Sequence, residues 1–232
     1  MIPITDNVLN RRKPIVTYYL IGINIVFFLW ELKLELSDQL QDFINSWGII
    51  PALFSDALTH ALGGNAAAGI VVLIHLPSLL IGIFLYSSFS QILGNLIFLW
   101  VFGKTIENTI GHCRFLGFYL IAGILSSLLQ ILMEPSLTAP IIGSNGVIAS
   151  ILGAYISAFP KAKIDTILPI VIVFIPVELP AFIYLFWWFV QQLFYSIGSL
   201  DVYSSVGQSG SSYLVQVVGL LFGAAFMRFL RR

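Results

Sequence analysis

Long stretches without a charged side chain dominate this sequence. A transmembrane helix needs about 20 mostly apolar residues, and an ionised side chain at the bilayer centre costs about 2.5–3.5 kcal/mol. Charge-free stretches therefore mark candidate spans. The chain has six of them: Ile15 to Trp30, Ala57 to Gly103, Phe115 to Met133, Pro135 to Pro160, Leu179 to Leu200 and Val202 to Met227. We expect an all-α membrane protein, in which residues 15–230 form one membrane domain and residues 1–14 form a cytoplasmic segment ahead of it.

The basic residues indicate on which side of the membrane each stretch ends. Lys and Arg accumulate in the cytoplasmic loops of membrane proteins. Ten of the eleven Lys and Arg residues fall into four clusters: Arg11, Arg12 and Lys13; Lys104 and Arg114; Lys161 and Lys163; and Arg228, Arg231 and Arg232. If all four clusters are cytoplasmic, an even number of crossings separates neighbouring clusters. The sequence therefore predicts six helices, a short loop between Lys104 and Arg114, and both termini in the cytoplasm.

The same parity decides which apolar segments cross the membrane. Two crossings precede the second basic cluster, and we place them at about residues 15–32 and 88–103. The apolar segment 66–86 then belongs to a large first outer loop, where we expect it to be embedded in the membrane without crossing it. Residues 167–177 are expected to lie at the interface, ahead of a fifth span from about Leu179 to Tyr195.

Composition and charge exclude several classes of protein. The chain is 58% hydrophobic and 9% charged, against roughly 25% charged in a soluble domain. The formal net charge is zero, so a nucleic-acid-binding surface is not expected. Cys113 is the single cysteine, and the Cys and His residues do not have metal-ligand spacing, so we expect neither an internal disulfide nor a metal or cofactor.

Polar residues inside the predicted spans are candidate functional positions, because they are expensive to bury in lipid. Asn95, Gln130 and Gln216 lie on three predicted helices, and Ser144 and Asn145 open the fourth. The alternative explanation for each is a hydrogen bond between helices, which contributes about 0.6 kcal/mol on average.

Small residues indicate that the fourth and sixth predicted helices pack closely. Gly146, Ser150 and Ala154 recur at intervals of four residues on the fourth helix, and Gly219 and Gly223 do so on the sixth. Such faces let helix backbones approach each other. We therefore expect the beginnings of these two helices to be neighbours.

A set of motifs in a fixed order extends over most of the chain. They are Gly94-Asn95 followed by Phe98 to Gly103; Glu107, Gly111 and Arg114; Gly143-Ser144-Asn145-Gly146 followed by Leu152 to Tyr155; Phe159 to Lys163; Leu179-Pro180-Ala181; and Gly219 with Gly223. In these motifs and in the six predicted spans, the chain resembles the rhomboid family of intramembrane serine proteases. The resemblance implies a six-transmembrane-helix rhomboid bundle with a large, membrane-embedded first outer loop, which agrees with the placement of residues 66–86.

The resemblance also indicates where catalytic residues belong. Rhomboids that cleave use a serine in a Gly-x-Ser-Gly motif on helix four and a histidine on helix six, and a His and an Asn on helix two line the oxyanion site. The resemblance puts Asn145 at the nucleophile position, Gln216 at the base position, and Tyr86 and Asn95 at the helix-two positions. Only Asn95 matches, so no catalytic residue is expected in this chain.

Neither carboxamide can perform the chemistry of the group whose position it occupies. Asn145 is not a nucleophile comparable to an activated hydroxyl, and Gln216 accepts no proton near neutral pH. Ser144 is one residue early, and because one residue of α-helix rotates a side chain by about 100°, we expect its hydroxyl to point away from the site. None of the chain's three histidines lies on helix six. Asn145 and Gln216 are predicted instead to hydrogen bond to each other as an interhelical clamp.

The leading hypothesis is a catalytically inactive rhomboid-like protein that binds transmembrane helices of partner proteins, as a scaffold, chaperone or assembly subunit. Its expected partners are membrane lipid and transmembrane proteins. The segments Phe89 to Asn95 and Gly198 to Leu200 are similar to rhomboids of photosynthetic bacteria, which implies a large complex of the bacterial plasma membrane or the thylakoid membrane.

Two alternatives remain. One is a working protease that uses Ser144 and another base, which labelling by a fluorophosphonate probe would reveal. The other is a channel or transporter for an uncharged solute, which a reconstituted flux assay would reveal. The absence of an internal sequence repeat argues against a transporter.

Overall fold

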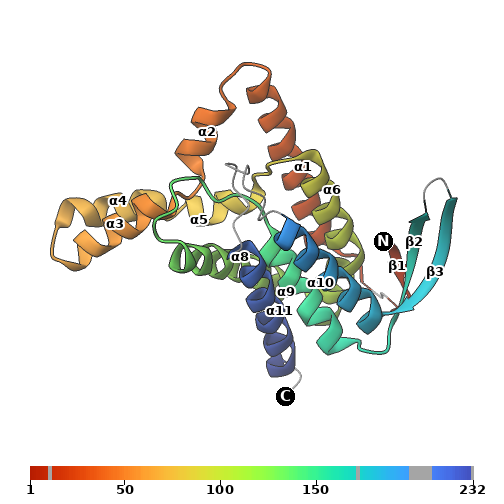
Figure 1. The fold of residues 1–232 in the computed structure, drawn as a ribbon. Helices are drawn as coiled ribbons and strands as arrows, with labels where there is room; N and C mark the ends of the chain where they lie inside the picture. Colours follow the sequence, from red (N-terminus) through yellow and green to blue (C-terminus); the bar gives the residue numbers. More distant parts are fainter. Residues whose placement is uncertain (10–11, 171–172, 199–210, 231–232) are drawn as a thin grey trace.

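The computed structural model describes residues 1–9, 12–170, 173–198 and 211–230 (Figure 1). Its elements follow one another along the chain as β1 (Ile2–Asp6), α1 (Ile15–Glu35), α2 (Leu40–Trp47), α3 (Pro51–Leu62), α4 (Ala66–His75), α5 (Ser78–Ile81), η1 (Gly82–Phe84), α6 (Phe89–Phe98), η2 (Leu99–Gly103), α7 (Lys104–Ile110), α8 (His112–Met133), α9 (Asn145–Ala158), β2 (Lys163–Ile170), β3 (Val173–Pro180), α10 (Ala181–Gly198) and α11 (Ser211–Leu230). The predicted helical membrane bundle is confirmed, and its helices follow the predicted order.

Among the residues that the structure describes, five helical segments are long and apolar enough to cross a bilayer: Ile15–Glu35, Ala66–Phe84, Phe89–Ile110, His112–Met133 and Tyr213–Leu230. The central helix α9 has only 14 residues, so it is about 21 Å long, which is shorter than the roughly 30 Å hydrocarbon core. At the start of this helix the polar side chain of Ser144 is buried inside the bundle.

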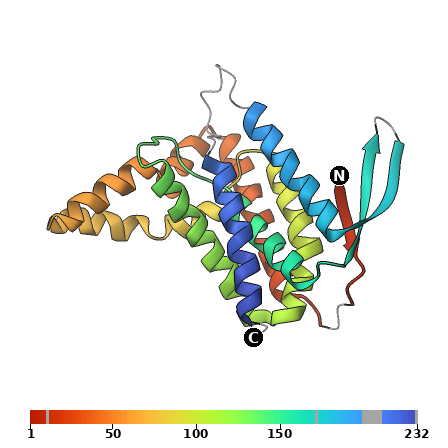
Figure 2. The same cartoon turned by 60° about the horizontal axis from the view of Figure 1, so that its bottom comes forward.

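The segment Ala66–Phe84 is a candidate span by length and composition, although parity predicts that it does not cross. The structure divides this segment into α4 and α5 near Pro77. α3 and α4 form a helical hairpin that projects away from the bundle in both views (Figures 1 and 2). α4 alone is about 15 Å long, which is too short to cross the hydrocarbon core. Its short length and its projection from the bundle are what we expect of an element of the first outer loop.

One detail of the predicted topology is wrong. The residues between Lys104 and Arg114 do not form a loop, because the helix continues through α7 to Ile110 and only Gly111 separates it from α8. Gly111 has a φ of 89°, a backbone conformation that favours glycine and ends the helix sharply.

Residues 167–170 and 173–177, which we expect at the interface, are strand residues of a β-hairpin. β2 pairs with β3 over its whole length, from Lys163↔Pro180 to Ile170↔Val173. β1, from the predicted N-terminal segment, pairs with the other edge of β2 to complete a sheet of order β1-β2-β3. β-branched residues are frequent in this stretch and favour a strand over a lipid-skimming coil.

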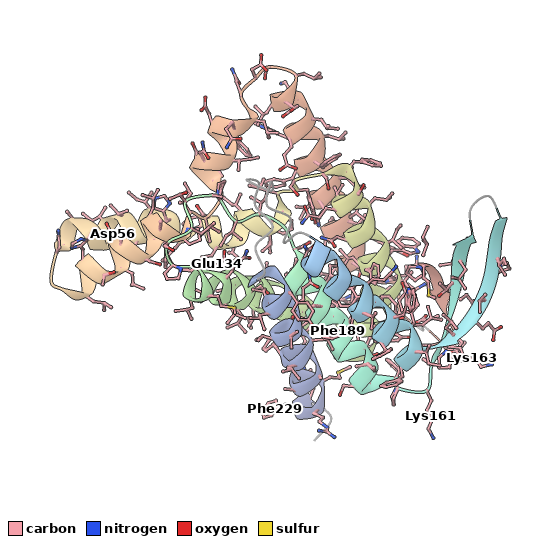
Figure 3. All side chains as sticks on the ribbon, viewed as in Figure 1. Asp56, Glu134, Lys161, Lys163, Phe189 and Phe229 are labelled. Carbon is pink, nitrogen blue, oxygen red and sulfur yellow. The ribbon has the colours of Figure 1, made fainter. Side chains whose placement is uncertain are left out.

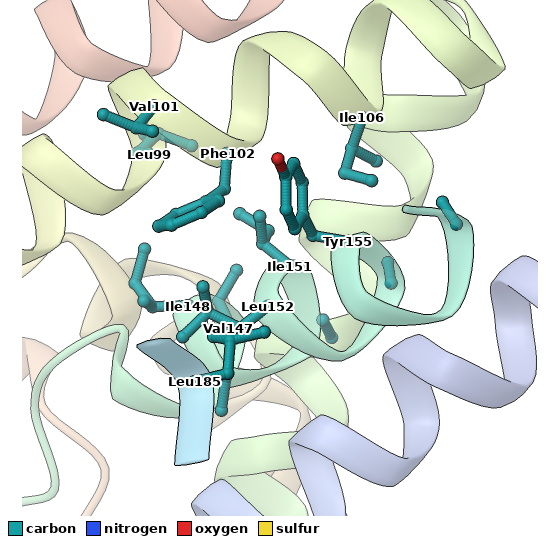
Figure 4. Packing of buried hydrophobic residues seen from close by; sticks show 14 of the residues in the cluster. Leu99, Val101, Phe102, Ile106, Val147, Ile148, Ile151, Leu152, Tyr155 and Leu185 are labelled. Carbon is teal, nitrogen blue, oxygen red and sulfur yellow. The ribbon is translucent and has the colours of Figure 1, made fainter. Parts of the chain in front are cut away.

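The core of the bundle is built around α9, which contacts α6, α8, α10 and α11. Nearly every side chain of α9 is buried. Figure 4 shows Phe102 and Tyr155 facing each other in this core, and their ring centroids lie 4.9 Å apart in an edge-on arrangement. Such aromatic pairs add about 0.5–1.5 kcal/mol beyond the area that they bury.

A buried carboxylate fixes the start of α1. Pro14 provides no side-chain cap for this helix, yet the backbone N–H groups of Val16 and Thr17 donate to Glu107 of α7 at 2.8 and 2.7 Å. The Thr17 hydroxyl and His112 Nδ1 also contact this carboxylate, at 2.6 and 2.5 Å. An anion at a helix N-terminus is favoured by the helix dipole, so Glu107 acts as the N-terminal cap of a helix 90 residues earlier in the chain.

Candidate functional site

The candidate site lies where the loop before α9 meets the start of α6. Gly143 has a φ of 111°, and its N–H donates to the Gly82 carbonyl at 2.9 Å. A Cβ at this position would lie 2.6 Å from Gln91 Nε2, so both the backbone conformation and the close approach of Gln91 require glycine. This turn directs Ser144 into the bundle, where it is 1% exposed.

Ser144 is at the centre of a polar cluster, contrary to the prediction that it points away. Asn95 Nδ2 donates to Ser144 Oγ at 3.0 Å and to Asn145 Oδ1 at 3.3 Å. The predicted rotation assumes that Ser144 is helical. Ser144 is instead the N-cap of α9, with φ −104° and ψ 19°, so it and Asn145 face the same amide. Tyr86 and Asn95, the two helix-two positions, also meet here.

The hydroxyl of Tyr86 connects Ser144 to the first helix. Tyr86 Oη donates to Asn24 Oδ1 at 2.5 Å and lies 3.0 Å from Ser144 Oγ. Since a phenol has one proton, which Asn24 accepts, the Ser144 hydroxyl donates to the phenolic oxygen. Burial raises the pKa of the Tyr86 hydroxyl to about 12. The oxygen next to the Ser144 proton therefore belongs to a neutral phenol, which is not an effective general base.

The predicted clamp between Asn145 and Gln216 is not formed. Asn145 Oδ1 accepts its hydrogen bond from Asn95, and Gln216 Oε1 is buried without a hydrogen-bond partner among the described residues. Gln216 lies on α11 and is 5% exposed. The base position thus carries a carboxamide oxygen whose burial without a partner is unfavourable.

No imidazole reaches this cluster, because the three histidines are elsewhere. His60 is on α3, where its Nε2 lies 3.4 Å from Asp56 Oδ1. His75 ends α4, and His112 contacts Glu107 at the start of α8.

The small residues of the predicted contact lie against each other along α9 and α11. A Cβ on Gly219 would lie 2.5 Å from the Gly146 carbonyl oxygen, and a Cβ on Gly223 would overlap the Ser150 carbonyl oxygen and lie 2.9 Å from Ala154 N. The Ser150 hydroxyl donates to the Gly146 carbonyl at 2.8 Å. We call this contact of Gly146, Ser150 and Ala154 with Gly219 and Gly223 the α9–α11 seam.

Three residues of the site were missed from the sequence. Gln91 lines a small cavity of about 80 Å³ together with Gln130 and Asn145, and its signal was its four-residue spacing from Asn95, which puts both on one face of α6. Asn24 and Glu31 of α1 approach from the other side, where the Tyr86 N–H donates to Glu31 Oε1 at 3.0 Å. Their signal was polarity within the first predicted span.

Comparison with known proteins gives a consistent result. A family model described as "Rhomboid domain" matches residues 74–232. Two relatives are "Rhomboid protein 1, mitochondrial" of Saccharomyces cerevisiae, 25% identical over 152 residues, and "Presenilin-associated rhomboid-like protein A, mitochondrial" of Danio rerio, 30% identical over 82 residues. The matches cover 63% and 34% of this chain, but only 37% and 21% of the relatives. The chain thus spans well under half the length of either relative.

Proposed function

The chain belongs to the rhomboid family, and we propose that it is a catalytically inactive member that binds transmembrane helices of partner proteins. The observation that carries this proposal is the hydrogen bonding of the nucleophile and base positions. Asn145 accepts a hydrogen bond where the resemblance places a serine nucleophile. Where it places a proton acceptor, Gln216 carries a carboxamide oxygen that has no hydrogen-bond partner within the described part of the chain. Proteolysis by a serine needs both a nucleophile and a base.

A fluorophosphonate probe tests the inactivity. The purified protein in mild detergent should remain unlabelled under conditions in which an active rhomboid is labelled. Asn145→Ser and Gln216→His together return both groups to the site, and labelling of this double variant demonstrates that the probe can enter. Labelling of the unaltered protein that disappears in Ser144→Ala would refute the proposal.

A working protease that uses Ser144 is the second candidate function. It is favoured by one observation, the 3.0 Å hydrogen bond from Asn95 to Ser144 Oγ, since Asn95 occupies an oxyanion position in the resemblance. The arrangement of Tyr86 argues against it, because a neutral phenol oxygen next to the hydroxyl does not remove its proton. The probe experiment separates the two functions directly.

The exposed face of α10 is where we propose that a partner helix binds. Phe182, Ile183 and Phe186 are 50–62% exposed and lie on one side of this helix. Helix association in membranes depends on van der Waals packing and interhelical hydrogen bonds. The exposed aromatic and aliphatic side chains of α10 provide a surface against which a partner helix can make van der Waals contacts. We propose that the protein acts there as a scaffold, chaperone or assembly subunit of a bacterial plasma-membrane or thylakoid complex.

Site-specific photocrosslinking in the native membrane tests this binding. A photoreactive residue at Phe186 should yield a discrete protein adduct, identified by mass spectrometry. The matched control is Leu221 on α11, which is 64% exposed and should yield lipid adducts only. Equal protein adducts from both positions, or none from Phe186, would contradict a docking surface on α10.

A further inference from the structure

The β2–β3 hairpin has no part in the site or in the proposed function. At its base, one face of the sheet packs on the bundle, where Ile164 and Thr166 of β2 are 0% and 1% exposed. The same face becomes progressively uncovered away from the base. Leu168 is half-buried, and its cross-strand partner Ile175 is 41% exposed. The hairpin therefore continues an apolar face beyond the part of the bundle that covers it.

Charged side chains of the hairpin are confined to its base. Lys163 Nζ lies 3.3 Å from Glu178 Oε2, and both side chains are mostly exposed. Asp165 pairs across the strands with Glu178, on the face opposite to Leu168 and Ile175. No charged residue occurs between positions 166 and 177. Figure 3 shows Lys161 and Lys163 at the base of the hairpin, so the element is polar at its base and apolar beyond it.

The free edge of the sheet is closed to a further strand. β3 is the outermost strand, and its Pro176 and Pro180 pair with Ile167 and Lys163. Proline has no N–H to donate to a neighbouring strand, so it fits a paired strand only where the backbone N–H would point away from that neighbour. On β3 these positions face away from β2, toward the place of a fourth strand. The edge therefore lacks donors at both positions, and prolines on an edge strand block strand addition. A partner that adds a strand to β3 does not fit this edge.

Lipid fits the apolar face better than a strand does, because the hairpin leads directly into an apolar helix of the membrane bundle. α10 begins at Ala181, directly after β3, and exposes Phe182 and Ile183 in its first turn. The hairpin and α10 diverge from a common base in both views (Figures 1 and 2). An open strand edge is excluded from the hydrocarbon centre, where its carbonyl groups find no partner. The interface, where one face meets acyl chains and the other meets water, satisfies both faces.

We propose that the apolar face of the β2–β3 hairpin that carries Leu168, Ile175 and Val177 is a lipid-binding surface that lies in the membrane interface. This face contacts acyl chains, and Asp165 and Glu178, on the opposite face at the base of the hairpin, contact water. This assignment does not depend on whether the protein is a protease.

Fluorescence quenching in lipid nanodiscs tests the proposal. In a Cys113→Ser background, Ile175→Cys and the matched control Glu178→Cys are labelled with an environment-sensitive fluorophore and placed in discs of phosphatidylcholine and phosphatidylglycerol. A lipid that carries a nitroxide near its headgroup should quench the label at position 175 about twofold, and aqueous iodide should quench it little. The label at position 178 should show the opposite pattern.

Other outcomes overturn the lipid assignment. Quenching of position 175 by iodide alone would place the hairpin in water, and protection from both quenchers would indicate contact with protein, from a partner or a second copy. Val177→Cys, on the same face as Ile175, repeats the measurement if Ile175→Cys does not elute like the parent protein. The photocrosslinking experiment on α10 is independent of either result.

Discussion

Helices α10 and α11 both pack against the central part of the bundle, but they are attached in different ways. Along the α9–α11 seam, glycine faces backbone, and Gly223 leaves no room for a methyl group beside Ser150. α10 is attached by rings instead: Phe98 of α6 lies 6.3 Å from Tyr184 and 6.1 Å from Trp188, measured between ring centroids. Backbone contact has one geometry, whereas rings on rotatable side chains tolerate tilting. The comparison predicts that α11 is a fixed part of the bundle and that α10 is the helix more able to tilt.

The largest effect is expected from closing the space in the seam. Gly223→Ala puts a methyl group onto the Ser150 carbonyl, and because neither backbone can retreat, it should lower the free energy of unfolding by more than about 3 kcal/mol. Steric-trap unfolding in bicelles measures this loss. Gly117→Ala on α8, where nothing lies within 4 Å of the new Cβ, is the control and should be neutral or slightly stabilising. A tolerated Gly223→Ala would show that the seam is not rigid.

A smaller and more local effect is expected at α10. Tyr184 is 1% exposed, and Tyr184→Ala should cost about 3 kcal/mol or less, because α10 can lean into the space. The specific readout is the mobility of a nitroxide at position 186, which should rise, while a nitroxide at position 221 on α11 should be unchanged. Equal changes at both positions would remove the distinction between the two helices.

The polar cluster is expected to contribute less again. Asn95→Ala removes both hydrogen bonds that Asn95 donates and leaves Asn145 Oδ1 without this donor, at a cost of about 1–3 kcal/mol. The exposed Asn45 on α2 is the matched position, and Asn45→Ala should change stability by less than about 0.5 kcal/mol. Thermal unfolding in detergent is sufficient to compare the two variants.

The smallest effect has the opposite sign. Gln216 lies on α11, and its Oε1 is buried without a partner, so Gln216→Leu should leave stability unchanged or raise it by up to about 1 kcal/mol. The control is Gln130→Leu on α8. A large loss of stability in Gln216→Leu would instead support a hydrogen bond between Gln216 and Asn145. Polar pairing, as well as close packing, would then stabilise the seam.

The helices and the seam could be predicted from the sequence because both depend on local patterns. A long charge-free stretch is a local signal for a helical span, and the four-residue spacing of Gly219 and Gly223 defines a face of one helix. The residues that the prediction missed depend on contacts far along the chain. Asn24 accepts a hydrogen bond from Tyr86, 62 positions later, and no local sequence pattern predicts that contact.

The orientation of Ser144 and the strands of the hairpin were not predicted for a different reason, because each depends on a choice of backbone conformation. The rotation expected for Ser144 assumed one more helical residue than α9 has. Residues 167–177 contain no charge, and an apolar run at an interface can be irregular or can pair as a strand. The pairing partner of the run was partly supplied by β1 at the far N-terminus, so the sequence around the run did not distinguish the two.

The capping of α1 by Glu107 has a consequence for biosynthesis. The ribosome makes the first helix well before it makes the carboxylate that Val16 and Thr17 bind, 91 and 90 residues later. At ordinary elongation rates this interval is on the order of ten seconds. During that time the first amides of α1 lack the acceptor that they have in the folded protein. The first turn of α1 is therefore capped only after α7 has been made.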